Sequence, residues 1–202
     1  NFDIKFDILI KKLLNYWYSE FNELSFNHEK ILNDLIEFFT QRIISHLEDL
    51  SYEKEIISST CESKNIKHLN ILDVVDLKNR IEIVQKLKLE KNSSNLINII
   101  SRYSKLANKG SLENNVYTCL DKININLFER ESEKNVFRFL QLLENLINTN
   151  NWKYSQIIKL FEENVPLLTE IFDTNNGVMI ISDDLNLRAN RLNLLALVRN
   201  YS

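Results

Sequence analysis

The stretch from Asp183 to Asn200, near the end of the sequence, constrains the fold more than any other part of the chain. At about 100° per residue it forms two apolar stripes on opposite sides of a helix, Leu185, Ala189, Leu192 and Ala196 on one and Leu187, Leu194, Val198 and Tyr201 on the other. A helix that is apolar on two sides belongs between packing layers rather than on a surface. We therefore predict a central helix, capped by Ser182, with Asp183 and Asp184 in its first turn.

The polar residues of this helix are confined to the two edges between the stripes. One edge carries Asn190, Asn193 and Asn200, and the other carries Arg188, Arg191 and Arg199. The planar fork of an arginine suits phosphates and guanine edges. It equally suits ion pairs across a helix interface, with Asp183, Asp184 or a neighbouring glutamate as partner. The sequence alone leaves both interpretations open.

Apolar periodicity predicts helices along most of the chain, and only two glycines and one proline interrupt it. The expected helices before the central one are 3–21, a long helix capped by Asn27, 52–61, 72–89, 93–106, a weaker one at 112–126, 129–149, 152–164 and 166–172, the last opened by Pro166. Gly110 is expected to end its helix in the left-handed conformation, and 178–181 to be a short extended piece. We predict an all-α, multi-helix bundle of about nine helices. It forms one domain over 1–202, with a soft sub-boundary near 62–70.

The bulk composition limits the class of protein. The net charge of −3 argues against a uniformly basic nucleic-acid binder, but it leaves room for a local basic patch because charge is screened over about 8 Å. No apolar run approaches the roughly 18 residues needed to span a bilayer, and no signal peptide opens the sequence. Cys61 and Cys119 are expected to be reduced core thiols, which fits the cytoplasm. The chain begins at Asn1 without a methionine, so we expect a fragment of a longer protein.

Residue types that carry catalysis are sparse or badly spaced. His28, His46 and His68 are far apart, and none has a partner at metal-ligand spacing. The two isolated glycines exclude a phosphate-binding loop. Acidic pairs such as Glu162 and Glu163 suit solvated helix faces. We predict no catalytic residue, no metal site and no cofactor in this chain.

Basic residues gather most densely between Ser101 and Lys109. Arg102, Lys105 and Lys109 recur at i, i+3 and i+7, on one face of about two turns of helix. They are either cations favoured by the dipole near a helix C-terminus or contacts to phosphate. Tyr103 is either a core residue or a ring on which a base stacks.

The C-terminal motif has a counterpart in a known family. Phe172-Asp173 is followed by Val178-Met179-Ile180-Ile181-Ser182-Asp183-Asp184 and then by Leu187-Arg188-Ala189-Asn190-Arg191-Leu192-Asn193-Leu194-Leu195. This order resembles the C-terminal end of the β subunit of bacterial-type glycyl-tRNA synthetase. There a Phe-Asp turn and a Val-Met-Val-like piece typically precede Arg-x-Asn-Arg-Leu-x-Leu-Leu. Three weaker stretches agree in order, 38–50 with Arg42, 73–87 with Arg80 and 102–110, while Ser101 and Tyr103 depart from the pattern.

The resemblance implies a function for the whole chain. In this family the region is a helical anticodon-binding domain, related to the all-α domain that ends arginyl-tRNA synthetase. The β subunit binds the tRNA of glycine, and the α subunit activates glycine with ATP and magnesium. The expected partners are therefore glycine tRNA, the rest of the β subunit and the α subunit, with no membrane and no DNA. The candidate tRNA-binding residues are Arg102, Tyr103, Lys105, Lys109, Arg188, Asn190 and Arg191.

Two alternative functions are left open. The first is a helical protein–protein interaction module that binds no RNA, since leucine-rich helices and mild acidity suit such a module well. The second is the anticodon domain of an arginyl-type synthetase. Salt dependence of RNA binding separates the first from a phosphate binder, which loses affinity steeply as salt rises.

Overall fold

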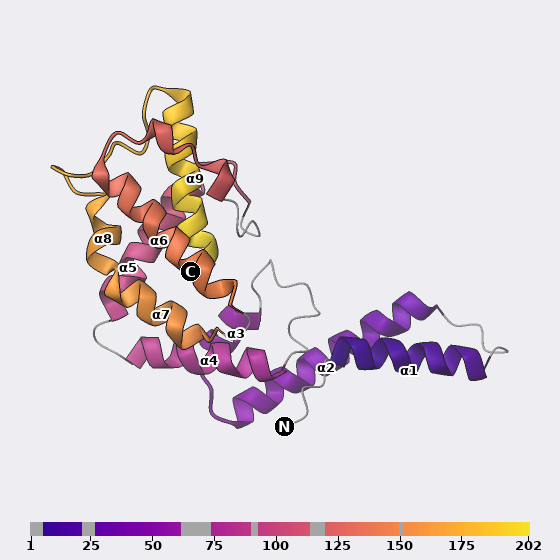
Figure 1. Cartoon of the computed structure of the whole chain (residues 1–202). Coiled ribbons are helices and arrows are strands. Elements are labelled where there is room, and N and C mark those ends of the chain that lie inside the picture. The colour runs from indigo at the N-terminus through magenta and orange to yellow at the C-terminus, as the bar shows by residue number, and fades with distance from the viewer. Residues whose placement is uncertain (1–5, 22–26, 62–73, 90–92, 114–119, 150–151) are drawn as a thin grey trace. The chain divides into compact units, whose positions relative to one another are not determined.

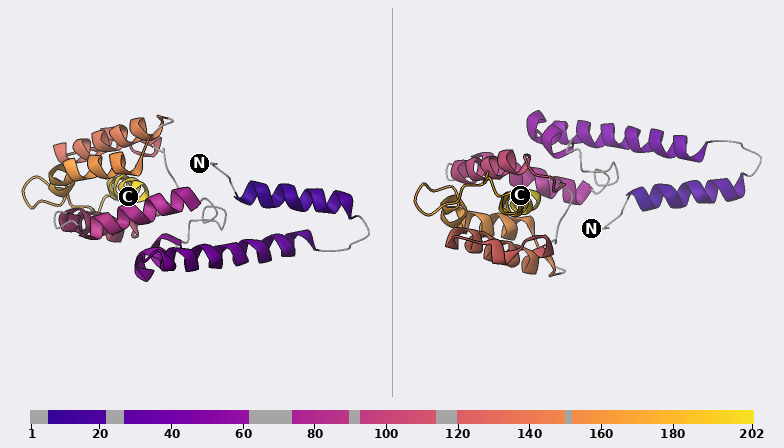
Figure 2. Two further views of the ribbon diagram at one scale, coloured as in Figure 1. Left: turned by 90° about the horizontal axis from the view of Figure 1, so that it is seen from below. Right: turned by 90° about the horizontal axis from the view of Figure 1, so that it is seen from above.

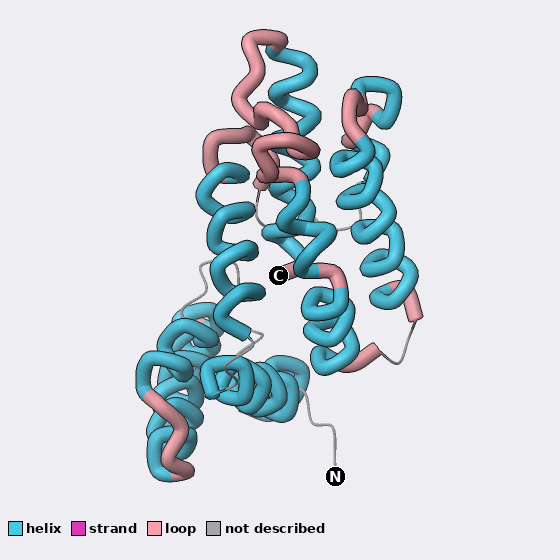
Figure 3. Tube along the Cα trace, turned by 90° about the vertical axis from the view of Figure 1, so that its left-hand side faces the viewer, coloured by secondary structure: helices cyan, strands magenta, loops and turns pink. Residues whose placement is uncertain are grey.

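The structure is a computed structural model that describes residues 6–21, 27–61, 74–89, 93–113, 120–149 and 152–202. All regular structure in these residues is helical, as the tube in Figure 3 shows. Nine α-helices and two short 3-10 helices are present in the described ranges, which confirms the predicted all-α, multi-helix bundle. The chain divides into two compact units, 1–89 and 90–202. The predicted sub-boundary at 62–70 lies outside the described residues.

The N-terminal unit contains α1 (Phe6–Glu20), α2 (His28–Asp49), α3 (Lys54–Cys61) and α4 (Val74–Leu89). α1 and α2 lie side by side in Figure 1 and share a small apolar contact around Ile10 and Ile36. A second cluster joins α2, α3 and α4, and its buried members are Leu47, Ile56, Ile57, Cys61, Leu77 and Ile81. The predicted cap of α2 is confirmed, because the Asn27 side chain accepts a hydrogen bond of 3.0 Å from the Lys30 amide.

Among the described residues, Ser51 and not Gly110 adopts the left-handed conformation, which corrects the prediction. Ser51 has a φ of 66° where the chain turns from α2 toward α3, whereas neither glycine has a positive φ. Gly110 is required for a different reason. A Cβ atom there would lie 3.1 Å from the Cβ of Leu192, so the absence of a side chain lets the end of α5 approach α9 closely.

The C-terminal unit is built around its last helix. It contains α5 (Ser93–Ala107), the 3-10 helices η2 (Leu120–Lys122) and η3 (Ile125–Leu127), α6 (Glu131–Ile147), α7 (Tyr154–Glu163), α8 (Val165–Glu170) and α9 (Leu185–Tyr201). Seen nearly along its axis, α9 lies between α5 on one side and α6 on the other (Figure 2). Every residue from Leu194 to Val198 is fully buried, so the prediction of a central helix is confirmed.

The first turn of α9 differs from the prediction. The helix begins at Leu185 and is capped by Asp184, whose Oδ1 accepts hydrogen bonds from the amides of Asn186 and Leu187. The Ser182 hydroxyl oxygen instead accepts a hydrogen bond from the Asp184 amide. Ser182 therefore positions the N-cap residue and is not itself the N-cap. Leu185 and Ala189 are exposed, which means that the first apolar stripe is covered only from Leu192 onward.

One further expectation is wrong where the structure describes it. The predicted helix over 112–126 is replaced, at its described end, by η2 and η3, and residues 114–119 with Cys119 lie outside the described part. The stretch 178–181 is neither helix nor strand, in keeping with a short piece that has no described strand to pair with. In contrast, Pro166 lies in the first turn of α8, as predicted.

Candidate nucleic-acid interface

α5 and the turn after it present a cationic surface whose side chains form no ion pair within the described residues. Arg102, Lys105 and Lys109 are all exposed, and none of them forms an ion pair with a described residue. The sequence from Ser93 to Leu112 contains no aspartate or glutamate. The structure thus places three of the predicted residues together on one helix and the turn that follows it, where a polyanion can reach them.

Arg102 is held in place by an aromatic ring from another segment. Its guanidinium carbon lies 4.3 Å from the centroid of the Phe172 ring, the geometry of a cation–π contact. Phe172 in turn packs edge-to-face on Tyr103, with 5.0 Å between ring centroids. This stack fixes the direction of Arg102 without an acidic partner, so its charge and hydrogen-bond donors stay available.

An open groove begins at this stack, with a volume of about 650 Å³. It is lined by Arg102 from α5, by residues of α8 and by two residues of the loop that follows α8: Pro166, Leu167, Thr169, Glu170, Phe172 and Asp173. The volume falls within the range of about 300–1,000 Å³ that is typical of small-molecule sites. One cation, one ring face and two carboxylates therefore meet in a space large enough for a nucleotide.

Tyr103 is a core residue, the first of the two alternatives that the sequence left open. The side chain is 0% exposed, and its hydroxyl donates a 2.9 Å hydrogen bond to the carbonyl of Leu168 in α8. Burial raises the pKa of the Tyr103 hydroxyl far above its ordinary range. Its contribution to the interface is indirect, because it supports Phe172 from behind.

We expect Tyr103→Phe to lower the free energy of unfolding by about 1–2 kcal/mol at pH 7, since it leaves the buried Leu168 carbonyl without a donor. The unfolded chain releases the tyrosine proton near pH 10 and the folded chain does not. The stability that Tyr103 contributes is therefore complete below about pH 10 and declines above it, by about 1.4 kcal/mol per pH unit. Urea unfolding at pH 7 and pH 11 should show the difference between the two proteins shrinking at the higher pH. An unchanged difference would contradict the assignment.

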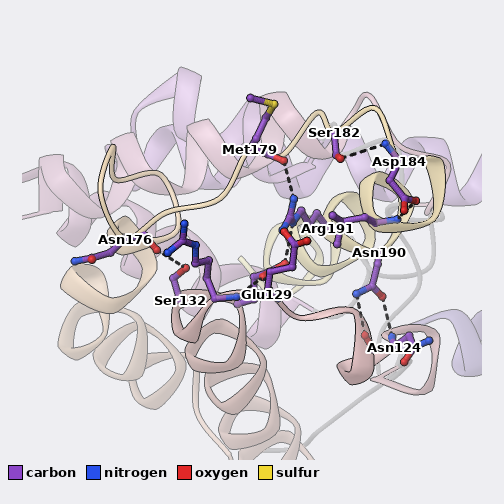
Figure 4. A network of polar contacts seen from close by, with 12 residues as sticks. Asn124, Glu129, Ser132, Asn176, Met179, Ser182, Asp184, Asn190 and Arg191 are labelled. Atoms are coloured by element: carbon purple, nitrogen blue, oxygen red, sulfur yellow. Dashed lines mark hydrogen bonds and ion pairs between the residues drawn. The ribbon is translucent and has the colours of Figure 1, made fainter.

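Arg191 is also internal, in the arrangement drawn in Figure 4. Its side chain is 3% exposed. Nε donates to Glu133 Oε1 at 2.8 Å, Nη2 to Glu129 Oε2 at 2.7 Å and Nη1 to the carbonyl of Met179 at 3.1 Å. Burial by itself lowers the pKa of Arg191, but the hydrogen bonds to Glu133 and Glu129 outweigh it and the pKa is raised. Of the two interpretations left open for Arg191, the structure shows the ion pair across a helix interface, because each of its three nitrogens donates to an acceptor within the chain.

Glu133 completes the network from the other side. It is fully buried at the first turn of α6. Its second oxygen accepts hydrogen bonds from the amides of Glu129 and Arg130 at 2.8 and 3.0 Å. The buried carboxylate therefore joins the start of α6 to the middle of α9, and every one of its bonds is charge-assisted.

Asn190 is the third predicted contact that the structure assigns to the interior. Its Oδ1 accepts from the Asn124 amide at 2.8 Å, and its Nδ2 donates to the Asn124 carbonyl at 3.0 Å. With only 5% of its surface exposed, it has a structural partner for each end of its amide, which holds the loop between η2 and η3 against α9.

The three arginines on this edge of α9 differ in whether their side-chain donors already have partners within the chain. Arg199 donates to Asn108 Oδ1, to Asn200 Oδ1 and to the Leu112 carbonyl, and burial lowers its pKa. Arg188 is half-buried, and its side chain makes no hydrogen bond or ion pair with a described residue. It is the member of the arginine edge whose donors are left for a partner.

Two chemistries have no support in the described residues. No group of three or more histidine, cysteine, aspartate or glutamate side chains is positioned there to hold a metal ion. None of the described helices combines the length and the apolar character that crossing a membrane requires.

The sequence is similar to several curated proteins of one kind. It is 26% identical over 200 residues to the glycine–tRNA ligase beta subunit of Acaryochloris marina, covering 97% of this chain and 28% of the relative. It is 27% identical over 183 residues to that of Synechocystis, covering 85% and 25%, and 24% identical over 195 residues to that of Clostridioides difficile, covering 96% and 26%. The chain thus spans about a quarter of the length of these relatives, and the resemblance noted in the sequence is confirmed. No protein-family model matches the chain.

Proposed function

We propose that this chain, as the counterpart of one part of glycine–tRNA ligase beta subunits, recognises the anticodon loop of glycine tRNA and so supports ATP-dependent glycylation. The observation that carries the proposal is the similarity to these subunits over 97% of the chain. The exposed cations of α5 support it, since a single-stranded loop offers both phosphates and splayed bases. Kinship with the anticodon domain of arginyl-tRNA synthetase, and a cytoplasmic location, remain parts of the same proposal.

The proposed mechanism leaves the chemistry to another subunit. Lys105 and Lys109 hold phosphates, Arg102 contacts a base or the adjoining backbone, and Arg188 is a further candidate contact on α9. Binding energy from this remote site positions the acceptor end of the tRNA. We assign glycine activation, with its ATP and magnesium, to the α subunit, and propose that the rest of the β subunit links the two sites.

We expect a charge-neutral α5 to lose tRNA binding selectively. The test is filter binding of the whole chain to glycine tRNA across a salt series, with Arg102, Lys105 and Lys109 each changed to glutamine. Affinity should fall at least about 100-fold at low salt. The slope of log K against log salt should flatten by about 1.4, since the lost phosphate contacts of Lys105 and Lys109 to a single strand contribute about 0.7 each.

A matched control carries the same charge change elsewhere on the C-terminal unit. Lys122, Lys134 and Lys159 are exposed, and changing all three to glutamine should leave the affinity within about threefold and the salt slope nearly unchanged. Equal losses in both variants would mean non-specific attraction, and would overturn the proposal. Competition by arginine tRNA as effective as that by glycine tRNA would favour the arginyl-type alternative.

One observation favours the protein-interaction alternative. The C-terminal end of α1 and the residue after it expose four aromatic side chains, each about half accessible: Tyr16, Trp17, Tyr18 and Phe21. Large exposed apolar side chains in such density mark interaction surfaces. A chain that binds no tRNA at any salt concentration would leave this alternative as the better description.

A further inference from the structure

The groove beside Arg102 has a composition that suits a base and not a phosphate. The guanidinium carbon of Arg102 lies 4.3 Å from the centroid of the Phe172 ring, and Glu170 and Asp173 also line the groove. Two carboxylates repel a phosphate that approaches Arg102 from the groove side. Carboxylate oxygens accept hydrogen bonds from the amino groups of bases, as acidic side chains do with the N4 amino group of cytosine.

We infer that this groove binds a single unpaired RNA base that carries an exocyclic amino group. The base stacks on the Arg102–Phe172 pair, and its amino edge donates to Glu170 or Asp173. The inference rests on the proposed function for the presence of an RNA loop, and it goes further by naming the pocket and the base chemistry that it selects. Uracil is disfavoured, because its carbonyl oxygens would face the carboxylates.

The stacking surface is built to stay rigid. Phe172 is backed by the ring of Tyr103, which is itself buried and bonded to α8 through the Leu168 carbonyl. α8 and α5 lie next to each other in Figure 1, so both walls of the groove come from packed helices. A platform whose side chains are already ordered loses little entropy when a base stacks on it.

The carboxylates of Glu170 and Asp173 make only a few long hydrogen bonds within the chain, so their oxygens can accept further bonds. Asp173 accepts only long bonds, of 3.3 Å each, from the Thr174 hydroxyl and the Asn175 amide. Glu170 accepts one bond of 3.5 Å from Asn135. Each carboxylate has further lone pairs for a ligand. The lysines lie one and two helical turns beyond Arg102, where they can take the neighbouring phosphates.

The test compares two labelled RNA octamers, all-cytidine and all-uridine, by fluorescence anisotropy with the whole chain at low salt. We expect the cytidine octamer to bind about tenfold more tightly, the effect of one good edge contact. Glu170→Gln with Asp173→Asn should reduce the preference to less than about twofold. Lys105→Gln with Lys109→Gln should weaken both octamers equally and keep the preference.

The outcomes separate this inference from the proposed function. Equal binding of both octamers by the unchanged chain overturns the base pocket, even where glycine tRNA binds as proposed. A preference that survives the loss of both carboxylates also overturns it. A preference that the carboxylates control, found in a chain that binds no glycine tRNA, supports the pocket and overturns the anticodon proposal. Because both carboxylate substitutions lie at positions that are at least partly accessible, an unchanged circular dichroism spectrum serves as the folding control.

Discussion

Replacing Arg191 by methionine is expected to lower the free energy of unfolding of the C-terminal unit by about 3–5 kcal/mol. The substitution keeps the volume and the apolar stem but leaves Glu133 as a buried charge without its counter-ion. Glu133 has no access to water, so hydration cannot replace the lost 2.8 Å bond. Urea unfolding followed by the fluorescence of Trp152, in a background where Trp17 is phenylalanine, reports on this unit alone.

A double-mutant comparison distinguishes a broken ion pair from a packing defect. Adding Glu133→Gln to Arg191→Met removes the stranded charge while the glutamine oxygen still accepts a bond from the backbone at the start of α6. Part of the lost stability should return, by about 1–3 kcal/mol. The control is Arg188→Met, three residues away and without an internal partner, which should cost less than about 0.5 kcal/mol. Similar losses at both arginines would contradict the structural role of Arg191.

Gly177→Ala is expected to destabilise the same unit by about 3 kcal/mol, the upper part of the usual cost of overpacking. A Cβ atom at Gly177 would lie 2.3 Å from the Asp173 carbonyl oxygen and 2.7 Å from both the Asp173 nitrogen and the Ile171 carbonyl oxygen. All three are backbone atoms, so no flexible side chain can move away to relieve the clash. The loop itself must open.

Amide hydrogen exchange locates the damage. The Val178 amide donates to the Ile171 carbonyl at 3.1 Å, and its protection should be lost in Gly177→Ala before that of α9. Gly110→Ala is the matched control, because its new methyl group meets chiefly the side chain of Leu192 at 3.1 Å, and it should cost less. If Gly177→Ala leaves both stability and exchange unchanged, the loop is not held as described.

Local sequence signals predicted the helices well, because period and caps depend on neighbouring residues. The two-sided pattern of α9 correctly indicated a helix between layers, and Asn27 was correctly identified as a cap. Errors arose where two local candidates compete. Ser182 and Asp184 are both good N-caps, and the winner depends on where the chain enters α9. The position of Gly110 after a helix predicts a left-handed stop. Its lack of a side chain instead serves the close contact with Leu192, which is far away in sequence.

In the candidate site too, the sequence predicts features that depend on one helix, but it does not predict contacts between residues that are far apart in the chain. The i, i+3, i+7 spacing of Arg102, Lys105 and Lys109 is a property of one helix, so the sequence could place them on one face. The two carboxylates that bind Arg191 lie 58 and 62 residues away in sequence, and no residue close to the arginine indicates that they are its partners. The sequence identifies Phe172 only as part of the C-terminal motif. Its contact with Arg102 depends on the packing of α5 against α8, which local sequence does not reveal.

The loop from Ile171 to Met179 belongs to two arrangements at once. Its beginning supplies Phe172 and Asp173 to the groove, its middle is fastened to α6 where the Ser132 hydroxyl donates to the Asn176 carbonyl, and its end offers the Met179 carbonyl to Arg191. An insertion or deletion here would displace the groove residues Phe172 and Asp173, and it would also break the contact between Met179 and Arg191 of α9. The length of this loop is therefore constrained by the groove, by α6 and by α9 at the same time.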